Sequence, residues 1–339
     1  MGDPRVTVLM SAYNAGRYVG EAVDSVLKQT FVDFEFLIFE DKSTDETLKI
    51  LRGCEDPRIL LIKNHENMGL TKNLAAGMEL ARGEYVARFD ADDCCELNRL
   101  ERQVAFLDAH PEIGLLGSAV TFFNDNGWEM IAHQPLTHEE IKCVLFYGYT
   151  MLHPTVMMRK AAFAQHGLNY DTTFRVSQDH DLWVRAIRKI RFANLYEPLV
   201  RMREHSGKIG STSNGLQRAY SDRVRERQLK ELGLVAESGD LRLLGEHETS
   251  VDHWVRENIE GFESLLLRIF HANQQVQIYD QEILITMGAA RFRELCRRLF
   301  LVGNRTGRYY WRSRLRHLDE PTVRQLAGLA FRMITVGFR

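Results

Sequence analysis

Acidic side chains gather in three short segments of the sequence, Glu40-Asp41, Asp90-Ala91-Asp92-Asp93 and Asp179-His180-Asp181. Carboxylates bind Mg²⁺ and Mn²⁺, accept N–H groups of a ligand, or take a proton from a hydroxyl. Asp90 and Asp92 stand two positions apart, so an extended backbone would place both on one side of the chain. Such a pair can hold a hard cation on a diphosphate, whereas a solvated acidic turn needs no ligand. On spacing alone, the acidic turn is the simpler interpretation.

The first two acidic segments each follow an apolar run with the pattern of a buried strand, residues 34–39 and 85–89. In an open α/β sheet, ligands bind just beyond the carboxyl ends of the strands. Acids at those positions face a ligand rather than a core. Their placement therefore suggests a nucleotide and metal site.

Three acids have a structural alternative to chemistry. Asp41 could accept a ring N–H of uracil, thymine or guanine, or it could stabilise the turn at residues 41–43. Asp179 stands in the first turn of an expected helix, where the macrodipole favours an acid without catalysis. Asp181 precedes Arg185 by four positions, and we expect an ion pair between them.

Strand and helix patterns alternate over the first part of the chain. We expect strands at 6–11, 34–39, 58–63 and 85–89, and helices at 19–27, 43–51 and 70–81, the second beginning with the capping box Ser43-Thr44-Asp45-Glu46. This alternation predicts an α/β fold with a mostly parallel sheet and right-handed crossovers.

The pattern is looser after Asp93. A helix is expected at 97–109, strands at 113–123 and 153–158, and a helix from Asp179. From about residue 213 the signals are almost wholly helical. We therefore predict an α/β domain over 1–215 and a helical accessory region over 216–339.

Composition places the chain among ordinary globular proteins. It has 339 residues, 45% hydrophobic and 27% charged, with a formal net charge of −2. The five cysteines include no C-x-x-C pair, so we expect mostly buried thiols in a reducing compartment. No leader-like N-terminal pattern and no apolar stretch of roughly 20 residues is found in the sequence.

Charge is unevenly distributed near the C-terminus. Residues 291–317 contain nine arginines against one acid, Glu294, and they include several aromatic side chains. The final stretch, 322–339, is loosely amphipathic. These helices are expected either to contact an anionic membrane surface or to pack on the catalytic domain or on another subunit of a homo-oligomer.

Several motifs follow one another in a recognisable order: Val6-Thr7-Val8-Leu9-Met10-Ser11-Ala12-Tyr13-Asn14, Phe39-Glu40-Asp41, Asn67-x-Gly69, Asp90-Ala91-Asp92-Asp93, His153-Pro154-Thr155 and Asp179-x-Asp181-Leu182-Trp183. Together they cover roughly residues 5–210. In order and spacing the chain resembles the family 2 inverting glycosyltransferases, which have the GT-A fold. The resemblance implies a Rossmann-like mixed sheet flanked by helices, with a C-terminal helical region.

The resemblance also implies a role for each candidate residue. Asp179 would be the general base, with Asp181 as its rival. Asp92 would hold Mn²⁺ or Mg²⁺ on the diphosphate, with His205 within reach of the metal. The nucleotide-sugar would contact Ala12, Tyr13, Asp41, Asn67, Asp90, Asp92, Arg203 and His205. Lys208, in the same loop as His205, is a further candidate for the diphosphate.

Two positions depart from the family pattern. Lys42 stands where a glycine often follows the aspartate, and Gln178 stands where a glutamate commonly precedes the base. Neither change removes a required carboxylate. Gln178 lowers the local negative charge, so the pKa of Asp179 is expected to be less elevated than that of a paired acid.

The expected function is a metal-dependent inverting glycosyltransferase of hexosyltransferase type. It would move a sugar, from a UDP-sugar by preference, to a hydroxyl of a glycan or lipid-linked acceptor in surface-polysaccharide assembly. The resemblance implies a cytoplasmic protein, peripheral at the inner face of the plasma membrane, with no nucleic-acid partner. A sugar-phosphate nucleotidyltransferase is the alternative enzyme, but no glycine-rich basic triphosphate loop is present. A catalytically idle carbohydrate-binding scaffold is disfavoured because Asp92 and Asp179 are both present.

Overall fold

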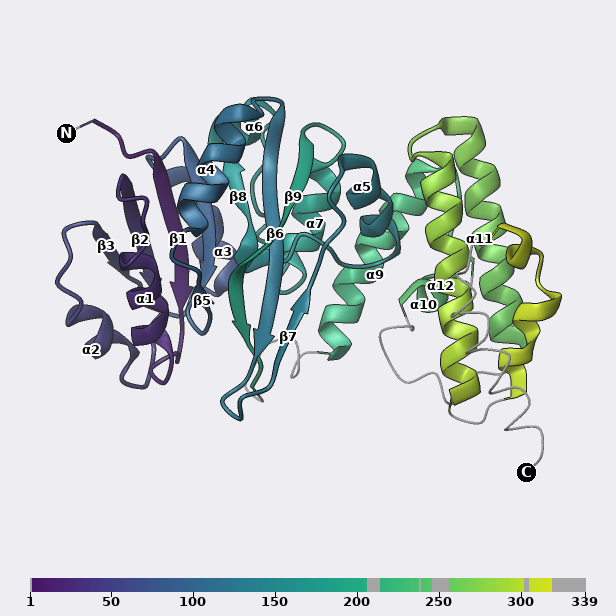
Figure 1. Cartoon of the computed structure of the whole chain (residues 1–339), viewed down its shortest axis with the longest axis horizontal. Coiled ribbons are helices and arrows are strands. Elements are labelled where there is room, and N and C mark those ends of the chain that lie inside the picture. The colour runs from purple at the N-terminus through teal and green to yellow at the C-terminus, as the bar shows by residue number, and fades with distance from the viewer. Residues whose placement is uncertain (1, 206–213, 238, 246–255, 302–304, 319–339) are drawn as a thin grey trace. The chain divides into compact units, whose positions relative to one another are not determined.

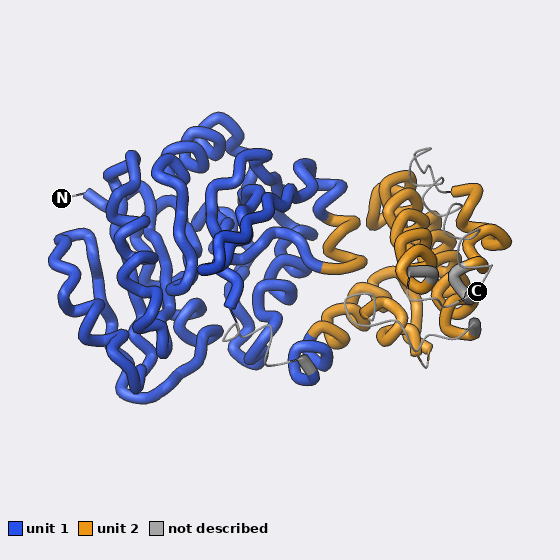
Figure 2. The backbone as a smooth tube through the Cα atoms, turned by 60° about the horizontal axis from the view of Figure 1, so that its bottom comes forward, with its two compact units in different colours: residues 1–141, 149–220 blue, residues 142–148, 221–339 orange. Residues whose placement is uncertain are grey.

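The computed structural model describes residues 2–205, 214–237, 239–245, 256–301 and 305–318 (Figure 1). The chain forms two compact units, residues 1–141 with 149–220 and residues 142–148 with 221–339 (Figure 2). The change from one unit to the other falls inside helix α9 (Asn214–Glu231). The predicted domain division at residue 215 lies at the start of the same helix.

A nine-stranded mixed sheet forms the centre of the first unit, in the order β3-β2-β1-β4-β8-β6-β9-β5 with β7 beside β6 (Figure 1). The strands are β1 (Val6–Ala12), β2 (Phe34–Glu40), β3 (Ile59–Lys63), β4 (Tyr85–Asp90), β5 (Cys94–Cys95), β6 (Ile113–Phe123), β7 (Glu129–Ala132), β8 (Met157–Arg159) and β9 (Arg191–Arg203). Strands β1, β2, β3, β4, β6 and β9 run in one direction, and β5, β7 and β8 run against them. The sheet is therefore mostly parallel, as the sequence predicts.

Helices cover both faces of this sheet. The helices of the first unit are α1 (Val19–Leu27), α2 (Thr47–Arg52), α3 (Leu70–Leu80), α4 (Arg99–Ala109), α6 (Lys160–Gln165) and α7 (Gln178–Ala186), together with the first residues of α5 (His138–Tyr147). Apolar side chains of α1 and α4 share a core cluster with Val8 of β1. On β1, the residue after Val8 is Leu9, and Gly77 of α3 packs against it so closely that a methyl group at position 77 would lie 2.3 Å from a Leu9 carbon. Neighbouring strand residues face opposite sides, so α3 covers the other face.

The carboxyl ends of the six parallel strands lie along one edge of the sheet. Ala12 of β1 pairs with Glu40 of β2, and Ser11 pairs with Asp90 of β4. Farther along the sheet, Phe123 of β6 pairs with Arg203 of β9. This edge therefore brings together the acidic segments after β2 and β4 and the segment after β9.

Two local expectations are wrong. The capping box at Ser43 does not form, because Ser43 accepts a hydrogen bond from the Asn14 N–H while Asp45 accepts those of Thr47, and α2 begins only at Thr47. The strand expected over 153–158 is reduced to β8, because residues 153–155 form a 3-10 turn in which the Thr155 N–H bonds to the Leu152 carbonyl. Pro154 has no N–H to donate to a neighbouring strand.

The second unit is helical, which confirms the predicted C-terminal helical region. It contains most of α9, α10 (Asp240–Gly245), α11 (Arg256–Val276), α12 (Gln281–Leu301) and the 3-10 segments η3 (Arg305–Arg312) and η4 (Arg314–Leu318), with the end of α5. Its core includes Phe262, Leu266, Phe292 and Tyr310. Among the helices that the structure describes, none combines the length and the apolar character needed to cross a bilayer. The amphipathic stretch 322–339 lies outside the described residues.

Candidate active site

Three aspartates lie at the end of β4 and in the turn that follows it. Carboxylate oxygens of Asp90, Asp92 and Asp93 all lie within 4.8 Å of one another. Asp90 and Asp92 are half-buried and Asp93 is buried, since β5 begins at Cys94 and holds the turn against the sheet. Three convergent oxygen ligands fit a hard divalent cation.

The segment after β9 reaches this acidic turn. The ring nitrogen Nε2 of His205 lies 2.9 Å from Oδ2 of Asp92, and the His205 ring is packed near Tyr18. Lys208, the further candidate in this segment, lies outside the described residues. The structure therefore brings together Asp92 and His205, the two residues predicted to hold the metal.

Arg203 is buried and supports the turn rather than projecting from a loop. Its backbone N–H donates to Oδ1 of Asp93 at 2.9 Å, and its Nε donates to the backbone carbonyl of Asp92 at 3.2 Å. The guanidinium also pairs with Asp125 at 2.6 Å and with Glu21. These contacts tie β9, the acidic turn, the 124–127 turn and α1 together, and they leave the Arg203 guanidinium already engaged.

Asp41 organises the loop that precedes α3. Its carboxylate accepts the backbone N–H groups of Met68 and Gly69, at 2.8 and 2.9 Å, and the side-chain amide of Asn64 at 2.7 Å. Asn64 in turn donates to Asn73. Asp41 is buried and lies at the end of β2, beside the start of α3. The sequence predicts that a nucleotide base binds next to this residue.

The other predicted contact residues differ in exposure. Ala12 is fully buried at the end of β1 and accepts the Asp41 N–H at 2.9 Å, whereas the Tyr13 side chain is 50% exposed. Asn67 is exposed in the loop that Asp41 holds. Of these three residues, Tyr13 and Asn67 have side chains open to a ligand, whereas Ala12 supports the start of the Asp41 loop through its carbonyl.

Asp179 opens α7 on a strained turn. Ser177, two residues earlier, has a left-handed backbone with φ of 56°, which directs the chain into the helix at Gln178. Burial raises the pKa of the Asp179 carboxyl, and the negative charge of Asp90 raises it further, against the hydrogen bond from the His180 N–H and the charge of Arg88. A carboxyl with a raised pKa suits a general base.

Asp181 has a different environment. It is 1% exposed and pairs with Arg185, whose Nε lies 2.8 Å from its Oδ2. The predicted ion pair is confirmed. Since Arg185 already occupies this carboxylate, Asp181 is a weaker candidate for the base than Asp179.

A buried polar cluster around Arg88 of β4 was not predicted from the sequence. Arg88 is 2% exposed and pairs with Asp90. Nearby, the Tyr170 hydroxyl lies 2.8 Å from Nε2 of His153, whose pKa is held well below its ordinary value by burial and by the charge of Arg88. The sequence feature that could have indicated this cluster is Arg88, a charged residue inside the otherwise apolar run 85–89.

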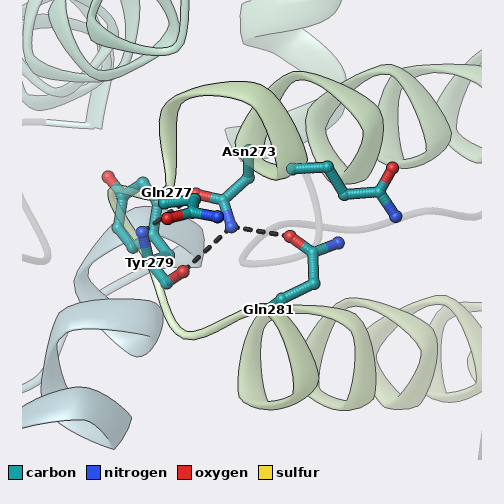
Figure 3. A pocket seen from close by; sticks show the side chains of 5 residues that line it. Asn273, Gln277, Tyr279 and Gln281 are labelled. Atoms are coloured by element: carbon teal, nitrogen blue, oxygen red, sulfur yellow. Dashed lines mark hydrogen bonds between the residues drawn. The ribbon is translucent and has the colours of Figure 1, made fainter.

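A pocket of about 290 Å³ lies in the second unit, at the turn between α11 and α12. Asn273 donates to the Tyr279 carbonyl at 2.9 Å and to Gln281 at 2.7 Å, so polar groups around it bond to one another (Figure 3). The lining residues are Asn273, Gln274, Gln277, Tyr279 and Gln281. Because this set includes no carboxylate, imidazole or thiol, we place the candidate active site at the acidic edge of the sheet.

The fold is that of the GT-A glycosyltransferases. The chain is similar to crystal structures of S. aureus TarS residues 1–349, with a TM-score of 0.58, 16% identity and 91% of each chain covered. A second TarS structure, in complex with UDP-GlcNAc, has a TM-score of 0.55, 17% identity, and coverage of 91% of this chain and 92% of that one.

Sequence comparison identifies the family. Residues 7–167 match the model of Glycosyl transferase family 2. The putative glycosyltransferase EpsE of Bacillus subtilis is 34% identical over 208 residues, which are 60% of this chain and 74% of EpsE. The amylovoran biosynthesis glycosyltransferase AmsE of Erwinia amylovora is 29% identical over 208 residues, 60% of this chain and 77% of AmsE. The chain belongs to glycosyltransferase family 2, as its motifs predict.

Proposed function

We propose that this glycosyltransferase moves a sugar from a nucleoside-diphosphate sugar, with UDP-sugars favoured, to a hydroxyl of a glycan or lipid-linked acceptor, with inversion at the anomeric carbon. The observation that carries the proposal is one arrangement at the carboxyl edge of the sheet. Three convergent carboxylates lie at the end of β4 and in the turn after it, and the pKa of Asp179 is raised by burial and by the charge of Asp90.

The donor is proposed to bind along the ends of β1, β2 and β4. Tyr13 presents its ring and Asn67 its amide, while Asp41 holds the loop 64–69 that would border the base. Asp90 is proposed to approach the ribose. The UDP-GlcNAc complex of TarS makes UDP the nucleotide to test first, because that protein shares the fold.

A divalent cation, Mn²⁺ or Mg²⁺, is proposed to be held by Asp92 and His205. The convergence of the three carboxylates and the 2.9 Å approach of the His205 ring to Asp92 fit such an ion. When bound, the cation would supply positive charge that offsets the charge developing on the departing diphosphate. Arg203 is a positioning residue in this proposal, because it holds Asp93 and the Asp92 carbonyl.

Asp179 is proposed to take the proton from the acceptor hydroxyl. The acceptor oxygen then forms its bond to the anomeric carbon, and the bond from that carbon to the diphosphate oxygen breaks with its electron pair. One displacement from the opposite side inverts the configuration. The name of AmsE supports a polysaccharide-building role, and we propose that the reaction takes place at the cytoplasmic face of the membrane.

The first test is calorimetric binding of UDP, dTDP, GDP and CDP with and without Mn²⁺. Asp92→Ala is compared with Asp24→Ala, which removes an exposed carboxylate on α1 that pairs only with Lys28 among the described residues. We expect one nucleotide to bind tightly in a Mn²⁺-dependent manner, and we expect Asp92→Ala alone to weaken it.

Inversion is tested separately, by determining the anomeric configuration of the glycosylated product by NMR. A product that retains the donor configuration would overturn the single-displacement mechanism. Absence of Mn²⁺-dependent binding for all four nucleotides would overturn the metal assignment, and it would favour a scaffold role or a metal-independent enzyme.

A further inference from the structure

A strongly basic surface is formed by residues 308–318 of the second unit, which we call the basic ridge. The exposed side chains of this segment include Arg308, Arg312, Arg314, Arg316 and His317. No acidic residue occurs between positions 308 and 318. The ridge therefore presents a concentrated positive charge in a chain whose overall charge is close to neutral.

The basic ridge has a defined structure. Tyr310 and Leu315 are fully buried in the core of the second unit. The buried carboxylate of Glu263, from α11, accepts the Ser313 hydroxyl at 2.8 Å and the Arg314 N–H at 2.7 Å. Because these inward contacts fix the backbone, the arginines between them are held on the outer side.

Three arginines of the basic ridge differ in their ion pairing from an arginine elsewhere in the second unit. On α12, Arg297 pairs with Glu294 at 2.5 Å. Within the part of the chain that the structure describes, no acid pairs with Arg312, Arg314 or Arg316. Cations clustered in so short a segment repel one another, so an anionic surface that binds them gains both attraction and relief of that repulsion.

Aromatic and apolar groups lie among these charges. Trp311 and Tyr309 are half-buried, and the Arg316 guanidinium lies 4.8 Å from the centre of the Trp311 ring. Leu318, at the end of the segment, is 38% exposed. Half-exposed aromatic rings beside arginines are typical of segments at the boundary between a bilayer and water.

We propose that the basic ridge docks the protein on anionic phospholipids. The mixture of cationic and amphipathic side chains favours a lipid surface over a soluble polyanion, which would need charge alone. The inference rests on the proposed function only in the role given to docking, which would bring the enzyme to a lipid-linked acceptor. Binding to a membrane can be measured without turnover.

The test is co-sedimentation of the full chain with vesicles of phosphatidylcholine alone and of phosphatidylcholine mixed with phosphatidylglycerol. We expect binding only to the mixed vesicles, and we expect added salt to weaken it. Each basic residue near an anionic leaflet contributes about fivefold to the partition coefficient. Replacing Arg312, Arg314 and Arg316 with Gln should therefore lower partitioning about 100-fold.

Two further variants keep the test specific. Replacing the same three arginines with Lys should retain most of the binding, because the charge is kept. Replacing Arg52, Lys189 and Arg191, exposed on the first unit, with Gln gives the same change in net charge and should leave partitioning within about twofold.

Three results would overturn the proposal: equal partitioning to neutral and anionic vesicles, an equal loss in the two Gln variants, or binding to single-stranded DNA that exceeds binding to the mixed vesicles. Nucleotide binding by calorimetry separates the two proposals. If the Arg312, Arg314 and Arg316 Gln variant loses vesicle binding but keeps nucleotide binding, the docking proposal is supported. If neither the wild type nor any variant binds nucleotide, the result counts against the proposed donor site and leaves the docking proposal unaffected.

Discussion

Arg88 is buried in β4 and forms an ion pair with Asp90, two positions farther along the same face of the strand. Burying a guanidinium costs several kcal/mol unless nearby charges and hydrogen bonds compensate. Among the described residues, Nε of Arg88 has no hydrogen-bond partner, so the compensation comes mainly from charge. Arg88 lowers the pKa of Asp179 while Asp90 raises it. A buried cation thus acts electrostatically on two acids of the candidate site.

The Arg88→Met variant tests this arrangement. Without the cation, the ionised form of Asp179 is less favoured, so the pKa of this carboxyl rises further. A general base must be ionised, and the acidic limb of the rate–pH curve should therefore move to higher pH. The measurement is release of nucleoside diphosphate from the donor over a pH series.

The Arg88→Lys variant is the control, because it keeps a positive charge in the strand and should move the limb less. Folding of each variant is checked by circular dichroism. An acidic limb that stays in place in well-folded Arg88→Met would show that Arg88 has no electrostatic role toward the base.

Asp179→Asn should abolish turnover and also stabilise the fold. The pKa of Asp179 is raised by burial, so the folded state binds this proton more tightly than the unfolded state does. Ionised Asp179 therefore lowers the free energy of unfolding above its folded-state pKa, and the penalty disappears as pH falls through the folded pKa toward the unfolded value. We expect Asp179→Asn to have the higher Tm near neutral pH, with a difference that vanishes in acid.

Asp181→Asn is the matched comparison. It removes the partner of Arg185 and should lower Tm, because Arg185 would lose a buried carboxylate. Nucleotide binding should survive in both variants. If Asp181→Asn stops turnover while Asp179→Asn retains it, the base has been assigned to the wrong aspartate.

The fold could be predicted largely from apolar periodicity. The runs 34–39 and 113–123 became strands β2 and β6 because alternating or continuous apolar residues identify buried strands. The two-residue β5 has no such pattern, since Cys94 and Cys95 form a strand only by pairing with β9. The capping box failed for a related reason: Asn14, from another loop, engages Ser43.

The acids of the site were visible in the sequence, but their partners were not. Asp41 stands directly after β2 and Asp92 two positions after the end of β4, where the sheet edge must place them. Their contacts depend on residues distant in sequence, such as Asn64 for Asp41 and His205 for Asp92. Before the fold was known, only the order of the family motifs linked residues so distant in sequence. That order did not predict the ion pairs and hydrogen bonds of Arg203.

Glu263 anchors the basic ridge, and its removal should destabilise the second unit. Glu263→Ala would leave the Ser313 hydroxyl and the Arg314 N–H without their acceptor, in addition to the Tyr309 hydroxyl that now donates at 2.8 Å. We expect a loss of about 3 kcal/mol in the free energy of unfolding, measured by urea denaturation. Glu294→Ala, which removes an exposed partner of Arg297, should change it by about 0.5 kcal/mol or less. Similar losses in the two variants would contradict the anchoring role.

Arg203 and Arg17 both pair with Asp125, and they offer a matched test of the acidic turn. Arg203 is 5% exposed and also holds Asp93 and the Asp92 carbonyl, whereas the Arg17 side chain is 73% exposed and its pair should contribute little. Groups that orient metal ligands typically change metal affinity by about 10-fold to 100-fold when they are replaced. Arg203→Leu should therefore weaken Mn²⁺-dependent nucleotide binding by about 10-fold or more.

Arg17→Leu should leave that affinity nearly unchanged, because the acidic turn keeps its buried support. The comparison is made by calorimetry at fixed Mn²⁺, with nucleotide binding in the absence of metal as the reference. The Arg203 backbone N–H still reaches Asp93 in the leucine variant, so the effect reports on the guanidinium alone. If Arg203→Leu weakened binding equally with and without Mn²⁺, the guanidinium would be acting on the nucleotide, as its family position implies, rather than on the geometry of the acidic turn.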